Sequence, residues 1–430
     1  MNLPHRPGAK SRREENGGKR NTHQERLTDA EKVRMRRDLV QQSLILMLAV
    51  VTVLTVIGIF MVFSATTVAS IRAADRSAEG IKLFSVAIKH TVYILAGVSA
   101  GFVLAHFTPK FYFRHFRAIF AAALILQLMV IFFGKEIYGN RNWLMLGPVQ
   151  IQPSEFLKGA LVIWLAAVLS RINAADLKKE TLTVPVLGFI SATAAVLIPG
   201  DMGTALIYVA IGAGMLWVAG ISRKFFLRSM VAAVLLAALF IAFKPSRLAR
   251  VTGFFTNLVT LPDTVAPTQS EFAQFAFGTG GMTGVGLGAG KEKWLDLREA
   301  HTDFIFAVIG EELGLFGTLT VLFLFLVLAW VFLRLALNHP SRFGQLTIAG
   351  AGLWICGQAF ANMCVVTGLL PVFGVPLPFI SQGGSAVIAN LAMVAVVAAF
   401  SLSVPGVRES MKIRSGIVHR AKAIVRKNHE

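Results

Sequence analysis

Long apolar runs, separated by short polar and basic loops, make up most of this chain. Most of them have about 17–25 residues, the length that an α-helix needs to cross the hydrocarbon core of a bilayer. The pattern predicts ten membrane-spanning helices, at residues 44–65, 89–107, 116–134, 155–171, 183–199, 203–220, 226–244, 311–336, 345–367 and 384–404. The predicted fold is therefore an all-α polytopic membrane protein.

Basic residues beside the apolar runs predict how the chain is oriented. With ten helices, the basic loops fall on the same side as both basic tails; these loops contain Lys110, Arg114, Arg117, Arg171, Lys178, Lys179, Arg223, Lys224, Arg228 and Arg342. We therefore expect both termini to be cytoplasmic. Residues 1–40 and 407–430 would be basic cytoplasmic tails, the first of them disordered, and residues 41–406 would form the transmembrane domain.

The composition agrees with a membrane protein and argues against a nucleic-acid partner. The chain is 55% hydrophobic and 15% charged, whereas soluble domains average about 25% charged residues. Its net charge is +19, but the positive residues lie at the two ends and in short loops, which is typical of membrane topology. Cys356 and Cys364 share one apolar run, roughly 12 Å apart along a helix, which is too far for a disulfide.

Three loops on the predicted outer face carry most of the candidate chemistry. They are residues 135–154, the long segment 245–303 between the seventh and eighth helices, and residues 368–383. Long loops are commonly functional, and the third is rich in proline and glycine, which prevents regular helix. Irregular backbone at membrane depth needs protein or water around it. We therefore expect the three loops to converge over one outward-facing cavity.

The glycine-rich run from Gly278 to Gly290 does not match a nucleotide-binding loop. It fits no G-x-G-x-x-G register, no strand is evident before it, and Lys291 is followed by Glu292 instead of Ser or Thr. Two interpretations remain, a backbone that approaches a ligand closely and a plain linker.

Asp303 ends the polar part of the long loop, immediately before an apolar run. An aspartate in this place is typical of a helix N-cap, and local pattern alone favours that interpretation. The alternative is a general base, because burial beside a membrane raises the pKa of a carboxylate into a useful range. His301 and Asp303 are only two candidate metal ligands, which is a weak signal.

Glu311 and Glu312 follow within the same run. If a helix began at Asp303, steps of about 100° per residue would place Glu312 nearly opposite Asp303. The uncharged stretch 313–333 is long enough to span by itself, so residues 303–312 form a separate interfacial turn in this prediction. Ionisable groups at that depth are either functional or members of stabilising pairs.

Two further polar positions begin predicted helices. Glu155 and Lys158 are three residues apart, so they share a helix face and we expect them to pair. Asp201, in the sequence PGDMGT, would cap the sixth helix.

Five segments, taken in order, resemble the SEDS family (shape, elongation, division and sporulation). They are QPSEFLK at 152–158, DMGTAL at 201–206, GGMTGVGLGAGKEKW at 280–294, EAHTDFIFAVIGEELG at 299–314 and PVFGVPLPFISQGGS at 371–385. The resemblance extends over residues 44–404. It implies a peptidoglycan glycosyltransferase that polymerises lipid II on the outer face of the bacterial plasma membrane. By the HTDF match, the family's catalytic aspartate falls on Asp303.

The resemblance also implies partners, namely a class B penicillin-binding protein as transpeptidase and other divisome proteins. The AVIGEELGL segment and the basic N-terminal tail are more similar to the division branch of the family than to its elongation branch, which predicts a location at the septum. The alternatives are an elongation polymerase, and a lipid II flippase or scaffold without catalysis.

Further substrate-binding candidates follow from these segments. Cations for the pyrophosphate are Lys158, Arg141, Lys291, Lys293 and Arg298. Other candidate contacts are Glu299, His301, Thr302, Glu155, Trp143, Asp201, Ser381, Gly383, Gly384 and Ser385. The chain departs from the family at Arg298, where Pro is usual, at Asn142-Trp143 instead of Arg-Trp, and in its last loop, where SYGGSS is usual. A divalent cation, Mg²⁺ or Mn²⁺, would assist the leaving group, but the sequence shows no dedicated site for it.

Overall fold

The computed structural model describes residues 29–76, 85–137, 140–147, 149–172, 181–224, 226–228, 268–293 and 299–412, with a few single positions between 231 and 255. Its helices are α1 (Asp29–Arg76), α2 (Ser85–His106), α3 (Pro109–Phe133), α4 (Pro153–Leu169), α5 (Thr183–Leu197), α6 (Met202–Val218), α9 (Gln269–Gly280), α10 (Ile305–Asn338), α11 (Arg342–Val366) and α12 (Gly384–Leu402). Six described helices are long and apolar enough to cross a membrane, by length and composition, and α5 and α6 are shorter apolar helices. The predicted fold class is confirmed.

The predicted spans coincide with described helices, except for the seventh at 226–244, most of which lies outside the described residues. The total of ten therefore stays a prediction. The hydrophobic pattern missed α9 and a small antiparallel sheet of β1 (Lys135–Ile137), β2 (Asn140–Leu146) and β3 (Val149–Ile151). The strands are too short to show a clear period. The buried residues of α9 are Glu271, Ala273, Ala276 and Gly280, which give little hydrophobic contrast.

The first helix begins earlier than the prediction placed it. Helix α1 starts at Asp29, so residues 29–40, expected as part of a disordered tail, are helical. This stretch is rich in Ala, Glu, Lys, Met and Arg, which are strong helix formers and compensate for its lack of apolar periodicity. Residues 1–28 and 413–430 of the predicted tails lie outside the described residues.

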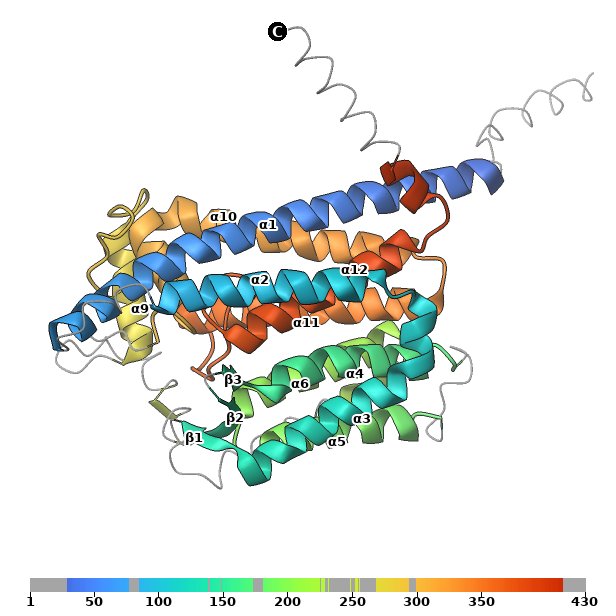
Figure 1. The fold of residues 1–430 in the computed structure, drawn as a ribbon, viewed down its shortest axis with the longest axis horizontal. Coiled ribbons are helices and arrows are strands. Elements are labelled where there is room, and N and C mark those ends of the chain that lie inside the picture. Colours follow the sequence, from blue (N-terminus) through green and yellow to red (C-terminus); the bar gives the residue numbers. More distant parts are fainter. Residues whose placement is uncertain are drawn as a thin grey trace, which may run out of the picture.

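The helices form two groups that lie side by side (Figure 1). In the view of Figure 1, α1, α2, α10, α11 and α12 lie above α3, α4, α5 and α6. The described chain begins and ends at the same end of this bundle, where the Ser410 hydroxyl donates to Gln41 Oε1 at 2.8 Å. The small sheet and α9 lie at the opposite end. This arrangement agrees with two termini on one side of the membrane.

Helix α10 contains a break that separates its first turns from its long apolar part. Gly314 has φ 66° and ψ −162°, which is not helical. Residues 305–313 are therefore a short helix of their own, as the prediction of a separate interfacial turn requires. The helix begins at Ile305, two residues later than a start at Asp303 would place it.

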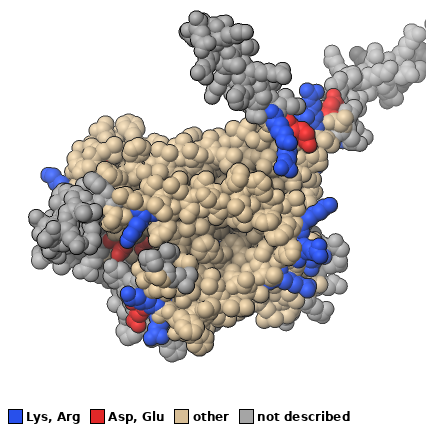
Figure 2. All heavy atoms as spheres, in the orientation of Figure 1, with Lys and Arg blue, Asp and Glu red and all other residues tan. Residues whose placement is uncertain are grey.

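Charged side chains are concentrated at the two ends of the helix bundle (Figure 2). On the face shown, Lys, Arg, Asp and Glu gather at the two ends of the bundle, and the surface between them is free of charge. Many of the exposed side chains on α2 and α10 are large and apolar, among them Leu95, Phe102, Phe316 and Phe323. Such a surface suits a hydrocarbon environment.

Candidate functional site

The segment that carries Asp303 is fixed by hydrogen bonds to its backbone carbonyl groups. Three successive carbonyl oxygens, those of residues 301–303, accept these bonds. The backbone N–H of Gln382 donates to the His301 carbonyl at 2.9 Å, and the Ser381 hydroxyl donates to the Thr302 carbonyl at 2.6 Å. The side-chain amide of Asn362 on α11 donates to the third at 2.7 Å. The end of the long loop is thus fixed to α11 and to the last outer loop.

The Asp303 side chain itself is left available. It is half-buried, and it does not cap α10, whose N-cap position is Phe304 and has no side-chain cap. No side chain or backbone group among the described residues donates a hydrogen bond to its carboxylate. Burial raises the pKa of Asp303 to about 7, and the negative charges of Glu299 and Asp201 act in the same direction. This is the state that a general base near neutral pH requires.

Asp201 connects the start of α6 to the loop that precedes α4. It caps α6 as predicted, accepting from the Thr204 amide at 3.0 Å, and it also accepts from Gln152 Nε2 at 3.2 Å. The backbone N–H of Gln152 donates to Ser385 Oγ at 2.9 Å. Burial raises the pKa of Asp201 as well. The described parts of the three outer loops therefore meet, whereas the outward-facing cavity that we expected them to cover stays a prediction.

Two glycines permit this close packing. A Cβ atom at Gly203, in the first turn of α6, would collide with the carbonyl oxygen of Phe373 in the last outer loop. A Cβ atom at Gly374, whose φ is +69°, would lie 3.3 Å from Asp303 Oδ2. The last outer loop thus presents bare backbone to the carboxylate.

Glu155 and Lys158 form a buried pair in the first turns of α4. Lys158 Nζ lies 2.8 Å from Glu155 Oε2, with side chains only 1% and 2% exposed, so the predicted pairing is confirmed. The ammonium also donates to Gln358 Oε1 at 2.8 Å and lies 5.2 Å from the ring centre of Trp354. Gln358 in turn donates to the Pro376 carbonyl at 2.9 Å. The pair therefore supports the last outer loop, and its charges also act on the pKa of Asp201.

Lys293, a predicted phosphate ligand, already has partners. Its ammonium is buried, pairs with the Glu312 carboxylate and donates to Ser64 Oγ of α1 at 3.0 Å. Ser64 Oγ donates to both oxygens of Glu312 at 2.7 Å. Since these contacts leave the ammonium enclosed, the geometry favours a stabilising role for Lys293 over direct contact with substrate.

The glycine-rich loop 281–293 lies directly on α10. The amides of Val285 and Gly286 donate to the carbonyl oxygens of Glu311 and Glu312, both at 3.0 Å. A Cβ atom at Gly284 would collide with the Glu312 carbonyl oxygen. This part of the loop therefore packs on a helix backbone, which a plain linker would not do, and the close approach of the loop to a ligand stays a prediction. Gly284 allows this contact with a helix backbone that the break at Gly314 exposes.

The remaining predicted residues are distributed over the outer loops and the start of α12. Arg141 on β2 is 57% exposed and lies 3.9 Å from the Glu136 carboxylate, and the Lys291 side chain is exposed. The other predicted positions are these: Trp143 is half-buried on β2, Glu299 accepts from the Thr302 hydroxyl at 2.7 Å, Gly383 is the N-cap of α12, and Gly384 packs on the Tyr93 ring. Arg298 lies outside the described residues.

Sequence reasoning missed Asn362 and Gln358. Both are buried on α11 and both bind the backbone of the last outer loop. They lie four residues apart inside an apolar run, which places them on one helix face. Polar side chains within a membrane span are functional candidates by default, and this signal was present but was sought only among charged residues.

The described residues include no group of three or more His, Cys, Asp or Glu side chains placed to hold a metal ion. We therefore assign no ligands to the predicted divalent cation.

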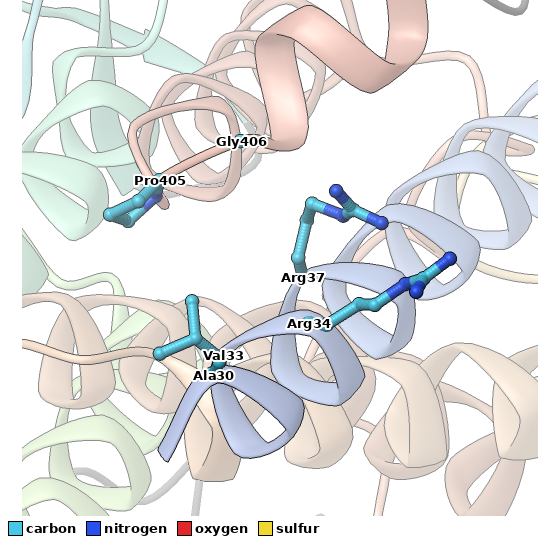
Figure 3. Close-up of a pocket in the computed structure, with 6 residues that line it drawn as sticks. All are labelled: Ala30, Val33, Arg34, Arg37, Pro405 and Gly406. Carbon is cyan, nitrogen blue, oxygen red and sulfur yellow. The ribbon is translucent and has the colours of Figure 1, made fainter. Parts of the chain in front are cut away.

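A separate cavity of about 590 Å³ lies at the other end of the bundle (Figure 3). It is lined by Ala30, Val33, Arg34, Arg37, Pro405 and Gly406. It lies near the described chain ends (Figure 1), so it is not part of the Asp303 site.

Comparisons with known proteins agree with this architecture. A model of the FtsW/RodA/SpoVE family, described as "Cell cycle protein", matches residues 44–404. The chain is 36% identical over 357 residues to the "Probable peptidoglycan glycosyltransferase FtsW" of Mycobacterium tuberculosis, which covers 82% of this chain and 66% of that relative. It is 34% identical over 359 residues to the protein of the same name from Nitrosomonas europaea, with 82% and 91% covered. The chain thus spans about two thirds of the length of the mycobacterial relative.

Two solved structures share the fold. One is described as "Structural coordination of polymerization and crosslinking by a peptidoglycan synthase complex", with a TM-score of 0.67, 24% identity, and 84% of this chain and 98% of that chain covered. The other is the rod shape determining protein RodA of Thermus thermophilus, with a TM-score of 0.62, 24% identity, and 83% and 95% covered.

Proposed function

Because this chain belongs to the FtsW/RodA/SpoVE family of cell cycle proteins, we propose that it is a peptidoglycan glycosyltransferase. It polymerises lipid II on the outer face of the plasma membrane during septal cell-wall synthesis. The observation that carries the proposal is the Asp303 carboxylate, which has a pKa raised to about 7 and no hydrogen-bond donor among the described residues, at the point where three outer loops meet. Curated relatives bearing the name of this activity support it.

The proposed reaction is one inverting displacement. The 4-hydroxyl of one lipid II attacks the anomeric carbon of a chain held on undecaprenyl pyrophosphate, and its proton passes to Asp303. The bond from that carbon to the pyrophosphate oxygen breaks, and its electron pair leaves with the pyrophosphate. Glycoside hydrolysis typically uses two carboxyl groups. One suffices here because pyrophosphate is a good leaving group and needs no acid.

Cations near the leaving group would stabilise its developing charge. Lys158 and Lys293 are engaged in buried ion pairs, so the exposed candidates, Lys291 and Arg141, are better placed to reach a lipid phosphate. Arg298 stays a candidate from the sequence. A Mg²⁺ or Mn²⁺ ion bound mainly by the pyrophosphate itself belongs to the same proposal.

We place the protein with a class B penicillin-binding protein at the division septum. Support for the partner comes from the likeness of the fold to a structure of a peptidoglycan synthase complex. Support for the division branch comes from relatives named FtsW. The multi-pass membrane location follows from the apolar helices.

The test is polymerisation of lipid II by the purified protein together with its transpeptidase partner. The wild-type protein should produce glycan strands, and Asp303→Asn should produce none while retaining the wild-type unfolding temperature. Normal glycan synthesis by folded Asp303→Asn would refute the base assignment. If the wild type makes no glycan and instead moves lipid II from one leaflet of a liposome membrane to the other, the result would favour a flippase.

A further inference from the structure

Asn362 makes an unusual pair of contacts beneath the Asp303 site. Its side chain is 1% exposed on α11. The single nitrogen Nδ2 donates to the Asp303 carbonyl at 2.7 Å and to the Val375 carbonyl at 2.8 Å. These two carbonyls belong to different outer segments. We propose that Asn362 is a positioning residue, which sets the place of the Asp303 carboxylate relative to the last outer loop. The inference rests on the proposed function of Asp303.

The orientation of this amide is determined by its neighbours. Both Nδ2 protons are used by carbonyl oxygens, so an exchange of Oδ1 and Nδ2 would bring three acceptors together without a donor. Oδ1 is buried and has no partner among the described residues. A buried acceptor without a partner is costly. The chain therefore retains an asparagine here at an energetic cost that an apolar residue would avoid.

The two carbonyls that Asn362 binds belong to the two segments that meet at the Asp303 carboxylate. One belongs to Asp303 itself, just before α10. The other belongs to Val375, the neighbour of Gly374, whose missing Cβ would face Asp303 Oδ2 at 3.3 Å. One NH₂ group thus fixes both the base and the backbone that faces it. A shift of either segment would therefore change the position of the carboxylate relative to this backbone.

The placement of Asp303 depends on hydrogen bonds to the main chain of its segment. Asp303 does not cap α10, and its carboxylate accepts no hydrogen bond from the described residues. Ser381 binds the preceding carbonyl, of Thr302, and also accepts from the Leu377 amide at 2.8 Å. Asn362 adds the contact from α11, a helix that belongs to neither outer loop.

Misplacing a catalytic group by about 1 Å costs on the order of 100-fold in rate. Since the base acts only as the hydroxyl attacks, we expect the loss in kcat, with the KM for lipid II changed less than threefold. Two substitutions separate the possibilities. Asn362→Leu keeps the branching of the side chain, although it is larger, and removes both hydrogen bonds. Asn362→Asp keeps the shape but sets a carboxylate against two carbonyls.

A matched control lies on the same helix. Thr347 is also fully buried on α11, and its hydroxyl donates only to the Phe343 carbonyl one turn away, at 2.8 Å. Thr347→Val removes one buried hydrogen bond without touching the outer loops. We expect it to leave kcat within threefold of wild type.

A second readout does not depend on polymerisation. A carbodiimide modifies protonated carboxyl groups, so the pH midpoint of Asp303 labelling, followed by peptide mass spectrometry, reports its pKa. Asn362→Leu should lower the midpoint because the released carboxyl becomes better hydrated. Asn362→Asp should raise it, because a third negative charge joins those of Glu299 and Asp201. A merely structural role predicts no such opposite shifts.

The outcomes decide the inference as follows. A 100-fold loss of kcat in folded Asn362→Leu, with opposite midpoint shifts in the two variants and none in Thr347→Val, supports it. A kcat within threefold of wild type overturns it and leaves the proposed function intact. If the wild type itself makes no glycan, the proposed function fails. The labelling then tests the positioning role alone, and unchanged pH midpoints in both Asn362 variants overturn it. If Asn362→Asp does not fold, Asn362→Leu is read alone.

Discussion

The buried pair of Lys293 and Glu312 offers a test that separates two interpretations of the same lysine. The sequence predicts that Lys293 binds a substrate phosphate, whereas the structure encloses its ammonium between Glu312 and Ser64. We consider the substitution Lys293→Met, which keeps the length of the side chain and removes its charge. Glu312 then retains the Ser64 hydroxyl and the Gly288 amide, but it has no cation.

The expected magnitude follows from the burial of both groups. Removing one partner of a buried ion pair costs about 3–5 kcal/mol, because an uncompensated charge remains. With about 2.1 cal/mol/K of unfolding entropy per residue and 430 residues, this corresponds to a fall of roughly 3–5 °C in unfolding temperature. The double variant Lys293→Met/Glu312→Gln removes the stranded charge, and Gln still accepts from Ser64. We expect it to recover at least half of the loss.

The assay is thermal unfolding in detergent at one fixed scan rate, since membrane proteins rarely unfold reversibly. A double-mutant cycle of the wild type, Lys293→Met, Glu312→Gln and the double variant gives the coupling energy between the two positions. Lys291→Met is the matched control, because this neighbouring lysine has an exposed side chain. The reasoning is refuted if Lys293→Met unfolds within 1 °C of wild type while its KM for lipid II rises. That result would show an ammonium free to bind substrate.

Three further predictions concern the outer site and the glycine loop. In the proposed mechanism Asp303 acts when deprotonated, and its pKa is about 7, so kcat should rise as the pH passes through about 7. Asp201→Asn should move this rise to lower pH, because it removes a negative charge that raises the pKa of Asp303; an unchanged pH profile contradicts the coupling. Gly374→Ala should lower kcat about tenfold or more, since its methyl would lie 3.3 Å from Asp303 Oδ2 at a φ of +69°; steady-state rates with lipid II test it, and normal kcat speaks against the placement. Gly284→Ala should lower the unfolding temperature, because its Cβ would collide with the Glu312 carbonyl; no loss of stability would mean that the loop lies elsewhere.

The helices were predictable because their signal is local. An apolar run long enough for a bilayer marks a span wherever it occurs, and the predicted ranges coincide with α1–α6 and α10–α12. The i, i+3 pair of Glu155 and Lys158 was found for the same reason, since one helix turn defines both positions. The cap at Asp201 also needed only its own sequence context.

Contacts between distant segments were not predictable in this way. Ser64 and Glu312 are separated by 248 positions, so no pattern along the chain connects them. The glycine run showed that backbone would approach something closely, but spacing does not say what. Only the three-dimensional arrangement shows that the partner is the α10 backbone beside Gly314. Asp303 likewise matched an N-cap by local pattern, and the helix begins two residues further on.

One physical requirement links the membrane environment to the candidate site. Irregular backbone near a bilayer must find hydrogen-bond partners within the protein, and the last outer loop finds them in Gln358, Asn362 and Ser381. Two of these side chains also bind the carbonyls of Thr302 and Asp303. Some of the side chains that satisfy this non-helical loop therefore also fix the segment that carries Asp303. A rigid site then follows from satisfying the hydrogen bonds of the backbone. Loosening the last outer loop should also loosen the segment that carries Asp303, and the reverse.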